Sequence, residues 1–351
     1  MSSNSFPDRA EAVWFTGPRR VELRSEAISH PAPNQVTVKA VRSLISAGTE
    51  MKFYRGDAGL TLEAAVTDLP TARLEAGPKI KYAYQCVGTV IEAGPESGFS
   101  VGNLVFARHP HQDFFTVPER YGEQLTLVRL PDGIDPEVGI FLNLTEVALN
   151  GLLDVPISLG DVVVVFGQGV VGTLVSQLAR RTAGRLVVVD PFENRRKLAL
   201  KLGADAAVDP KEANIAVMEM SKGRGADVAI EVSGAGSALQ QAINLTGRDG
   251  TVLALSFYGD HPVDLVLAPE FHLRRIKVAS SFVGYLNPKI TARWDFERRG
   301  QTAIDLLPTL NTSDLISHRF PLHKAPDAFE LLDRKPSDVV GVALTYGGGG
   351  A

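Results

Sequence analysis

The stretch DVVVVFGQGVVG, residues 161–172, decides the fold predicted for this chain. Its first half is almost wholly apolar, which is typical of a strand buried on both faces of a parallel sheet. Its second half has the glycine spacing of a phosphate-binding turn. The first glycine of such a turn allows a tight bend, the second lets the main chain approach a pyrophosphate, and the third lets the next helix pack on the strand. Because the N-terminus of that helix attracts anions, we expect a dinucleotide to bind along Gly167, Gln168, Gly169, Val170, Val171 and Gly172.

An acidic residue further along supports this interpretation. Asp190 ends the next apolar run and follows Gly172 by 18 residues, close to the ~20 expected of the acid that binds the adenosine ribose hydroxyls. A carboxylate there accepts hydrogen bonds from a diol and repels a 2′-phosphate, so the sequence favours NAD(H) as the cofactor. Arg195, a further candidate cofactor ligand, and Arg196 follow closely and keep NADP as an alternative. The remaining alternative is a plain βαβ turn without a ligand.

A second turn follows the apolar run DVAIEV at 227–232. Ser233 and Gly234 would then lie at the carboxyl end of a strand, which is where ligands bind in doubly wound sheets. We expect this turn to hold the nicotinamide ribose. The alternative is structural, with Ser237 capping the next helix.

The order of apolar runs predicts two domains. Up to about residue 150 the chain has short alternating strands such as 36–45 and 86–94, which indicate an antiparallel barrel-like domain. Beyond it, strand-sized runs alternate with helix-like segments, which specifies a doubly wound parallel sheet. The tail is too short for a third domain. We therefore expect an α/β fold with a β-barrel domain over 1–151, a doubly wound domain over 152–287, and a segment over 288–351 that completes the first domain.

Composition excludes several classes of protein. The chain has 351 residues, 44% of them hydrophobic, and 36 Lys+Arg stand against 40 Asp+Glu, which gives a net charge of −4. This balance speaks against a nucleic-acid or membrane partner. Cys86 is the single cysteine, so neither an intramolecular disulfide nor a Cys-rich zinc site can form. The N-terminus lacks a basic region followed by an apolar run, so we expect a cytoplasmic protein.

With these motifs in hand, the chain resembles the medium-chain dehydrogenase/reductase superfamily over residues 10–346. The resemblance rests on GQGVVG after the apolar strand, on KLGADAAVDP at 201–210 and on ISHRFPLHKAPDAFELL at 316–332. The motif SAGTE at 46–50 resembles a branch related to bacteriochlorophyllide dehydrogenase. The resemblance implies a GroES-like first domain, a Rossmann nucleotide-binding domain and a return to the first domain.

This sequence departs from the family pattern at the positions of the zinc ligands. Where the family has a Cys, a His and a later Cys or Glu, this chain has Ala47, Tyr84 and, by a looser alignment, Asn143. Alanine has no donor atom, and Tyr and Asn are poor zinc ligands. The four-cysteine lobe of the structural zinc is also missing. We therefore expect no metal.

Three residues are candidates for a catalytic role. Thr49 matches the family position whose hydroxyl passes the substrate proton outward, although such a threonine can equally bond its own backbone. Tyr84 stands where a ligand would point into the active site, and either donates a proton to a ketone or fills the space of the metal. His109 lies close to where the resemblance places substrate entry. Its pairing with His111 as a metal site is disfavoured, because Pro110 between them restricts convergence.

Other polar residues are candidates for the substrate pocket, namely Glu50, Gln85 and Asn143. They favour a hydroxylated substrate such as a polyol or sugar derivative, whereas the branch resemblance allows a tetrapyrrole-like one. Cys86 has no basic partner nearby in the sequence and is expected to be a buried structural thiol.

The resulting hypothesis is a zinc-independent, NAD(H)-dependent oxidoreductase, similar to alcohol dehydrogenases, that transfers hydride between nicotinamide and a secondary alcohol or ketone. One alternative is an NAD(P)H-dependent enone or quinone reductase. Another is a dinucleotide-binding protein without catalysis. The resemblance also implies a homodimer in which sheet edges near 277–283 pair across a twofold axis.

Overall fold

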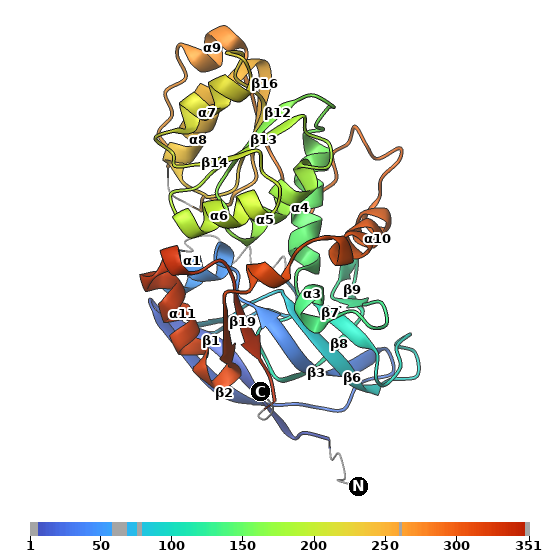
Figure 1. The fold of residues 1–351 in the computed structure, drawn as a ribbon. Coiled ribbons are helices and arrows are strands. Elements are labelled where there is room, and N and C mark those ends of the chain that lie inside the picture. Colours follow the sequence, from blue (N-terminus) through green and yellow to red (C-terminus); the bar gives the residue numbers. More distant parts are fainter. Residues whose placement is uncertain (1–5, 58–68, 76–78, 260–261, 348–351) are drawn as a thin grey trace. The chain divides into compact units, whose positions relative to one another are not determined.

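The computed structural model of the chain describes residues 6–57, 69–75, 79–259 and 262–347. The chain forms two units, one made of residues 1–143 and 316–351, the other of residues 144–315. Figure 1 shows the first unit in blue, cyan and red and the second in green to orange. Each unit is described by itself below.

The second unit is built on a parallel six-stranded sheet of order β14-β13-β12-β15-β16-β17. Counted along the unit this is the order 3-2-1-4-5-6 of a dinucleotide-binding fold. All five residues of the central strand are buried, as their apolar run predicts. The strands are β12 (Val162–Phe166), β13 (Arg185–Val189), β14 (Ala206–Val208), β15 (Ala226–Glu231), β16 (Thr246–Ala254) and β17 (Lys277–Ser280).

Helices connect these strands, as Figure 1 shows. α7 and α8 pack against one face of the sheet, where Val164 and Phe166 meet Val217 and Ile243. The strand β14 and the helix α7 are additions to the elements expected from the sequence. The helices of the unit are α4 (Leu142–Asp154), α5 (Val170–Ala179), α6 (Glu193–Lys201), α7 (Ala213–Met220), α8 (Gly236–Leu245), α9 (Glu270–Arg274) and α10 (Phe296–Leu306).

The first unit is made mainly of antiparallel sheets. Its largest sheet has seven strands in the order β11-β7-β6-β3-β19-β18, with β8 paired to β3, and a second sheet has the order β2-β1-β5-β4. The strands are β1 (Arg9–Gly17), β2 (Arg20–Ala27), β3 (Gln35–Leu44), β4 (Arg73–Glu75), β5 (Lys79–Lys81), β6 (Cys86–Ala93), β7 (Leu104–Ala107), β8 (Phe114–Pro118), β9 (Arg120–Tyr121), β10 (Gln124–Leu125), β11 (Leu127–Arg129), β18 (His318–Pro321) and β19 (Val342–Thr345). The helices are α1 (Thr49–Arg55), α3 (Pro136–Gly139) and α11 (Ala325–Arg334).

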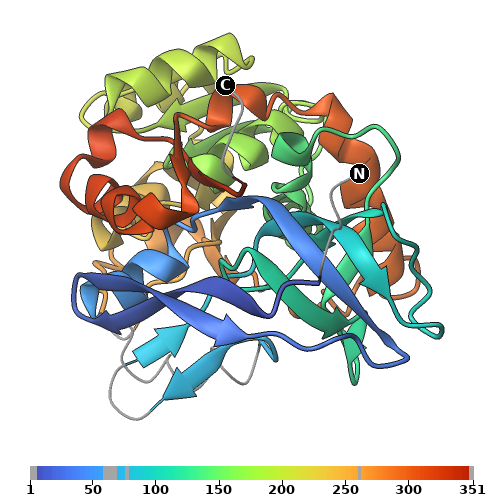
Figure 2. The same ribbon diagram turned by 90° about the horizontal axis from the view of Figure 1, so that it is seen from below.

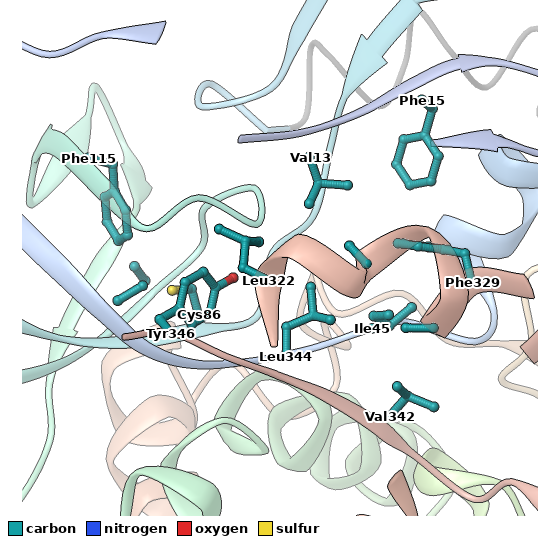
Figure 3. Packing of buried hydrophobic residues seen from close by; sticks show 14 of the residues in the cluster. Val13, Phe15, Ile45, Cys86, Phe115, Leu322, Phe329, Val342, Leu344 and Tyr346 are labelled. Carbon is teal, nitrogen blue, oxygen red and sulfur yellow. The ribbon is translucent and has the colours of Figure 1, made fainter. Parts of the chain in front are cut away.

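The C-terminal segment completes the first unit. β19 pairs antiparallel with β3, and Figures 1 and 2 show the red strand beside the blue one. In the core, the rings of Phe15 from β1 and Phe329 from α11 meet edge to face at 5.2 Å. Figure 3 shows Leu344 and Tyr346 of the C-terminal segment packed in the same cluster as Cys86. Cys86 is fully buried, and burial raises the pKa of its thiol, which supports its reading as a structural residue.

The borders between the units differ from those expected at 151/152 and 287/288. The structure places residues 144–151 and 288–315 in the second unit. Within that unit, Arg299 of α10 donates to Asn150 of α4, and Gln177 of α5 exchanges two hydrogen bonds with the main chain of Asn311. These contacts join segments far apart in the sequence, so apolar patterns could not locate the borders.

No helix in the described part of the chain is long and apolar enough to cross a membrane. The α/β fold expected from the sequence, a GroES-like β domain with a Rossmann domain, is confirmed.

Candidate functional site

The glycine turn of the second unit is held by close main-chain contacts. Gly167 has φ +96°, a left-handed conformation that favours glycine, and a Cβ there would lie 2.9 Å from Ser233 Cβ. A Cβ on Gly172 would lie 1.9 Å from the carbonyl oxygen of Gly167. At Gly169, by contrast, a Cβ would meet no atom within 4 Å. Two of the glycines are therefore needed by the fold itself, and the middle one leaves an open space at the start of α5, where a phosphate can approach.

The Gln168 side chain makes its hydrogen bonds within the turn and to the helix that follows it. Its Nε2 donates to the carbonyl of Gly167 at 3.1 Å and to Ser176 Oγ at 3.1 Å, and the side chain is fully buried. Val170 and Val171 open α5. The six turn residues thus lie together at the carboxyl end of the central strand, where doubly wound sheets bind their ligands.

Asp190 lies beside this turn, as expected. Its Oδ2 accepts from the main-chain N–H of Gln168 at 2.7 Å, and its Oδ1 accepts from the N–H of Phe192 at 2.8 Å. The Nη1 of Arg195 is 3.8 Å from Asp190 Oδ2. Burial lowers the pKa of Arg195, and the charge of Asp190 opposes that change. Arg196 instead donates to the main-chain carbonyls of Asp190 and Pro191.

The second turn is organised by a carboxylate that the sequence analysis missed. Glu231, at the end of β15, accepts from the N–H and the hydroxyl of Ser233, from the N–H of Gly234 at 3.1 Å and from Tyr258 Oη at 2.5 Å. Burial, the hydrogen bond to Glu231 and its charge all raise the pKa of Tyr258. Helix α8 begins at Gly236 with Ala235 as its N-cap, so the alternative of a cap by Ser237 is wrong.

In the first unit, the structure brings together two of the three catalytic candidates. Tyr84 lies between β5 and β6, and Thr49 begins α1. The Tyr84 hydroxyl is 3.4 Å from Thr49 Oγ1 and 2.8 Å from Ser46 Oγ. Both Tyr84 and Thr49 are partly exposed, whereas Ser46 is buried. Three hydroxyls therefore form one cluster, which we call the tyrosine cluster, with two members open to solvent.

Electrostatics keep the proton on this tyrosine. Burial raises the pKa of Tyr84 above its ordinary value of 10.0, and the hydrogen bonds with Ser46 and Thr49 act in the opposite direction. The charge of Glu50 raises it further. Because the phenol is neutral at pH 7, it can donate a hydrogen bond to an oxygen that gains negative charge.

The third catalytic candidate lies elsewhere in the unit. The ring of His109 stacks on Phe115 at 3.9 Å, and its Nδ1 donates to the carbonyl of Pro110 at 2.9 Å. Burial lowers the pKa of His109 well below 6.5, so the imidazole is neutral at pH 7. None of the hydrogen bonds resolved in the described residues joins His109 to Tyr84 or Thr49.

The candidate pocket residues are largely buried. Glu50 is fully buried behind the tyrosine cluster, with Oε1 accepting from the Ser46 N–H at 3.0 Å. Gln85 is also fully buried, and its Nε2 donates to the carbonyl of Leu44 at 3.3 Å. Asn143 Oδ1 accepts from Arg108 Nε at 3.2 Å. These residues support the walls of the site more than they line an open surface.

The groups at the expected zinc positions do not fit a zinc ion. Ala47 has no donor atom, the Tyr84 hydroxyl is engaged with Ser46, and Asn143 Oδ1 is engaged with Arg108. Within the described ranges, no three His, Cys, Asp or Glu side chains gather into a group that could hold a metal.

Sequence reasoning missed Ser46 of the tyrosine cluster and two residues buried near it, Ser43 and Tyr346. A usable signal existed for Ser46, because the spacing Ser46 to Glu50 is close to that of a helix-capping box. Ser43 and Tyr346 are hydrogen-bonded at 2.7 Å across a separation of 303 residues, which no local pattern reveals.

Comparison with known proteins places this fold and site in a class. Residues 170–297 match the family model described as zinc-binding dehydrogenase. A D-guloside 3-dehydrogenase of Shigella flexneri is 28% identical over 276 residues, which cover 76% of this chain and 78% of that protein. The 2-desacetyl-2-hydroxyethyl bacteriochlorophyllide A dehydrogenase of Cereibacter sphaeroides is 25% identical over 352 residues, covering 92% and 93%.

Solved structures share the fold. A Sinorhizobium meliloti protein described as a zinc-binding dehydrogenase, with NADP bound, superposes with a TM-score of 0.76 at 22% identity, covering 97% of this chain and 100% of that one. An Escherichia coli alcohol dehydrogenase in complex with NADH superposes with a TM-score of 0.75 at 17% identity, over 97% and 100%. The fold and site define a dinucleotide-binding dehydrogenase architecture. The chain is similar to the zinc-type alcohol dehydrogenase-like proteins of the medium-chain dehydrogenase/reductase superfamily.

Proposed function

We propose that this chain is a zinc-independent, NAD(H)-dependent oxidoreductase that interconverts a secondary alcohol and a ketone. The observation that carries the proposal is the Tyr84 hydroxyl, held by Ser46 and Thr49 at the position where the family has a zinc ligand. The relatives named above are dehydrogenases, which supports the reaction class.

The tyrosine cluster takes over the task that a metal ion performs in zinc-type enzymes. A carbonyl oxygen gains negative charge as hydride arrives at its carbon, and a preorganised donor stabilises that charge. Tyr84 donates to this oxygen. Ser46 and Thr49 donate to the Tyr84 oxygen and so stabilise the phenol as its proton moves towards the substrate. When bound, the nicotinamide supplies or accepts the hydride.

The second unit holds the cofactor in this proposal. The open space at Gly169 admits the pyrophosphate, and the Ser233–Gly234 turn receives the nicotinamide ribose. Asp190 binds the adenosine ribose diol, and its charge disfavours a 2′-phosphate, so we propose NAD(H). Arg195, 3.8 Å from Asp190, and Arg196, which donates to the Asp190 carbonyl, are nearby cations that would favour NADP.

The substrate we propose is a hydroxylated, sugar-derived molecule. The guloside dehydrogenase relative supports this class, and so does the number of hydroxyl groups in the tyrosine cluster, which can hydrogen-bond a polyol. Gln85 and Asn143 lie behind the site, and we expect them and the neutral His109 to act on substrate binding rather than on hydride transfer.

A cofactor-turnover panel tests the proposal. Purified protein is incubated with NADH or NADPH and ketones, enones and quinones, and with NAD⁺ and secondary alcohols, while zinc is measured by elemental analysis. We expect NADH-linked ketone reduction that survives a chelator. Turnover of enones or quinones alone indicates the reductase alternative, and tight NADH binding without turnover of any compound indicates the non-catalytic one. One zinc per chain whose removal abolishes activity refutes zinc independence.

We also propose that the protein is a homodimer formed at the edge of the second unit. In the described sheet β17 is the terminal strand, paired only with β16, which leaves its other edge open to a strand of a second copy. Large apolar side chains are exposed close to this edge, namely Leu273, Val278, Phe282 and Tyr285. Light scattering at micromolar concentration should give twice the chain mass, and a monomer would refute the proposal. Val278→Lys should shift the mass towards the monomer.

A further inference from the structure

Behind the tyrosine cluster lies a row of buried polar groups that the proposed reaction does not use. Ser43 and Glu50 are fully buried, and His111 is 1% exposed. They come from β3, from α1 and from the segment before β8, and they meet in the interior of the first unit. A buried carboxylate is costly unless donors satisfy it, so this arrangement requires an explanation.

The hydrogen bonds in this row form a continuous chain. Glu50 Oε2 is 2.8 Å from His111 Nε2, and a carboxylate only accepts, so Nε2 carries a proton. His111 Nδ1 is 2.7 Å from the Ser43 hydroxyl, and the Ser43 hydroxyl is 2.7 Å from the Tyr346 hydroxyl. Each polar group of the row therefore has a hydrogen-bond partner.

The other oxygen of the carboxylate leads to the site. Glu50 Oε1 accepts from the main-chain N–H of Ser46 at 3.0 Å, while Ser46 Oγ accepts from the N–H of Thr49 at 3.2 Å. This reciprocal pair resembles a capping box and lies at the start of helix α1, whose N-cap is Gly48. A capping box alone requires nothing beyond Ser46 and Glu50. Here the Ser46 hydroxyl also bonds Tyr84, and the carboxylate also bonds His111.

We propose that His111 is a positioning residue for Tyr84: it holds Glu50, Glu50 holds the main chain of Ser46, and the Ser46 hydroxyl sets the Tyr84 hydroxyl. This inference rests on the proposed function, because it assigns Tyr84 the role of donor. It adds a residue with no contact to the substrate, which acts through three successive hydrogen bonds.

The physical reason lies in the buried carboxylate. Two N–H donors, from Ser46 and His111, compensate its removal from water. When the donor from His111 is lost, the carboxylate turns towards other donors, and its hold on Ser46 weakens. A displacement of about 1 Å at a catalytic group can cost on the order of a hundredfold in rate. A smaller shift transmitted through Ser46 should cost about tenfold.

The kinetic test replaces His111 by Phe, which keeps an aromatic ring and removes both nitrogens. His111→Phe should lower kcat about tenfold and leave KM for NADH unchanged, because the cofactor residues belong to the second unit. His111→Gln, which restores an N–H donor, should recover part of the loss. Thr37→Val is the matched control, since it removes a partly buried hydrogen bond of the same unit, between the buried Thr37 and Thr116, and should leave kcat unchanged.

A double-mutant cycle separates positioning from general damage. If His111 acts through Tyr84, His111→Phe should cause no further loss of kcat in a Tyr84→Phe background. Equal losses in both backgrounds, or full kcat in folded His111→Phe, would overturn the proposal.

A spectroscopic test keeps the proposal separate from the proposed function. With 3-fluorotyrosine placed at position 84, the ¹⁹F resonance should shift in His111→Phe and stay in place in Thr37→Val. Should His111→Phe fail to fold, Ser43→Ala, which removes the hydrogen-bond partner of both His111 Nδ1 and the Tyr346 hydroxyl, should give a smaller shift of the same resonance. No shift overturns the positioning role, whether or not the protein turns over a ketone. If Tyr84→Phe keeps full kcat while the ¹⁹F resonance still shifts in His111→Phe, only the donor role of Tyr84 is overturned.

Discussion

The phosphate-binding turn of the second unit and the tyrosine cluster of the first unit are held together by different kinds of groups. The turn is made of main chain: Gly167 packs against Ser233, Gly172 against Gly167, and Asp190 is bound to the N–H of Gln168, 22 residues away. The tyrosine cluster is made of side chains. The bonds between Tyr84 and its two partners span 38 and 35 residues, and the supporting bond between Glu50 and His111 spans 61.

This difference decides how each site tolerates change. Main-chain donors stay in place under most substitutions, so the turn should fail only where a new side chain enters the phosphate space or the glycine contacts. Side-chain donors disappear with the residue. We therefore expect the tyrosine cluster to be the more sensitive region for rate and the turn to be the more sensitive region for cofactor affinity.

The largest expected effect is in the tyrosine cluster. Tyr84→Phe removes the proposed donor, and loss of such a donor typically costs about 2.7–4 kcal/mol, on the order of a hundredfold or more in kcat. NADH affinity, measured by fluorescence titration, should stay nearly unchanged. Tyr82→Phe, the same change two residues away, is the control. Full activity in Tyr84→Phe would place the donor elsewhere, and His109 would be the next residue to replace.

The second effect is in the turn. Gly169→Val puts a side chain into space where the structure has no atom within 4 Å of the Cβ position, so the fold should tolerate it. Crowding of a packed contact costs about 1–3 kcal/mol, which corresponds to a tenfold to hundredfold weaker binding of NADH. Titration calorimetry measures the NADH affinity of the variant, and thermal unfolding of the same sample measures its stability.

Gly172→Val is the contrasting variant, because its Cβ would meet the Gly167 carbonyl at 1.9 Å. It should lower the unfolding temperature as well as NADH binding. Unchanged NADH affinity in Gly169→Val would argue against a pyrophosphate at this turn.

A third, smaller effect concerns the choice of cofactor. Asp190→Ser removes the carboxylate that would face a 2′-phosphate, and the ratio of NADPH to NADH dissociation constants should fall about tenfold. The substitution also frees the N–H groups of Gln168 and Phe192 and so destabilises the turn. This loss affects both cofactors alike and cancels in the ratio. Equal affinities of the unmodified protein for NADH and NADPH would refute the role given to Asp190.

The smallest effect lies away from both sites and tests how the C-terminal segment is attached. Hydrogen bonds from Arg319 on β18 and from Arg42 on β3 lower the pKa of Glu137 from 4.5 to about 2. This shift corresponds to about 3 kcal/mol before solvent screening. The side chain of Arg319 is 45% exposed, so we expect about 1 kcal/mol.

The sign follows from the lowered pKa. The stabilisation is fully present above pH 4.5 and is lost as the pH falls from 4.5 towards 2. Glu137→Gln should therefore lower the free energy of unfolding at pH 7 and make no difference near pH 2, as urea titrations can show. Glu123→Gln, at an exposed carboxylate, is the control. A difference that persists at pH 2 would contradict the ion-pair explanation.

Much of the Rossmann unit was predictable because its signals are local. The apolar run 162–166 becomes the buried central strand, and Asp190 lies beside the turn at the expected distance in sequence. In the first unit the pairing of Thr49 with Tyr84 was predictable only through the family resemblance. Ser43 and Tyr346 carry ordinary polar side chains, and the sequence around each has no feature that marks it for a site.

The amino-acid sequence by itself determined the parallel sheet, the glycine turn and its acidic partner, since each depends on residues a few positions apart and on main-chain geometry. Only the tertiary structure decided the borders between the units, the Glu231 carboxylate as the centre of the second turn, and the choice of His111 over His109 as the partner of Glu50. The physical reason is the range of the interactions. A hydrogen bond between side chains forms wherever folding brings a donor and an acceptor within about 3 Å, and two histidines separated by one proline look alike until the sheet turns one towards Phe115 and the other towards a buried carboxylate.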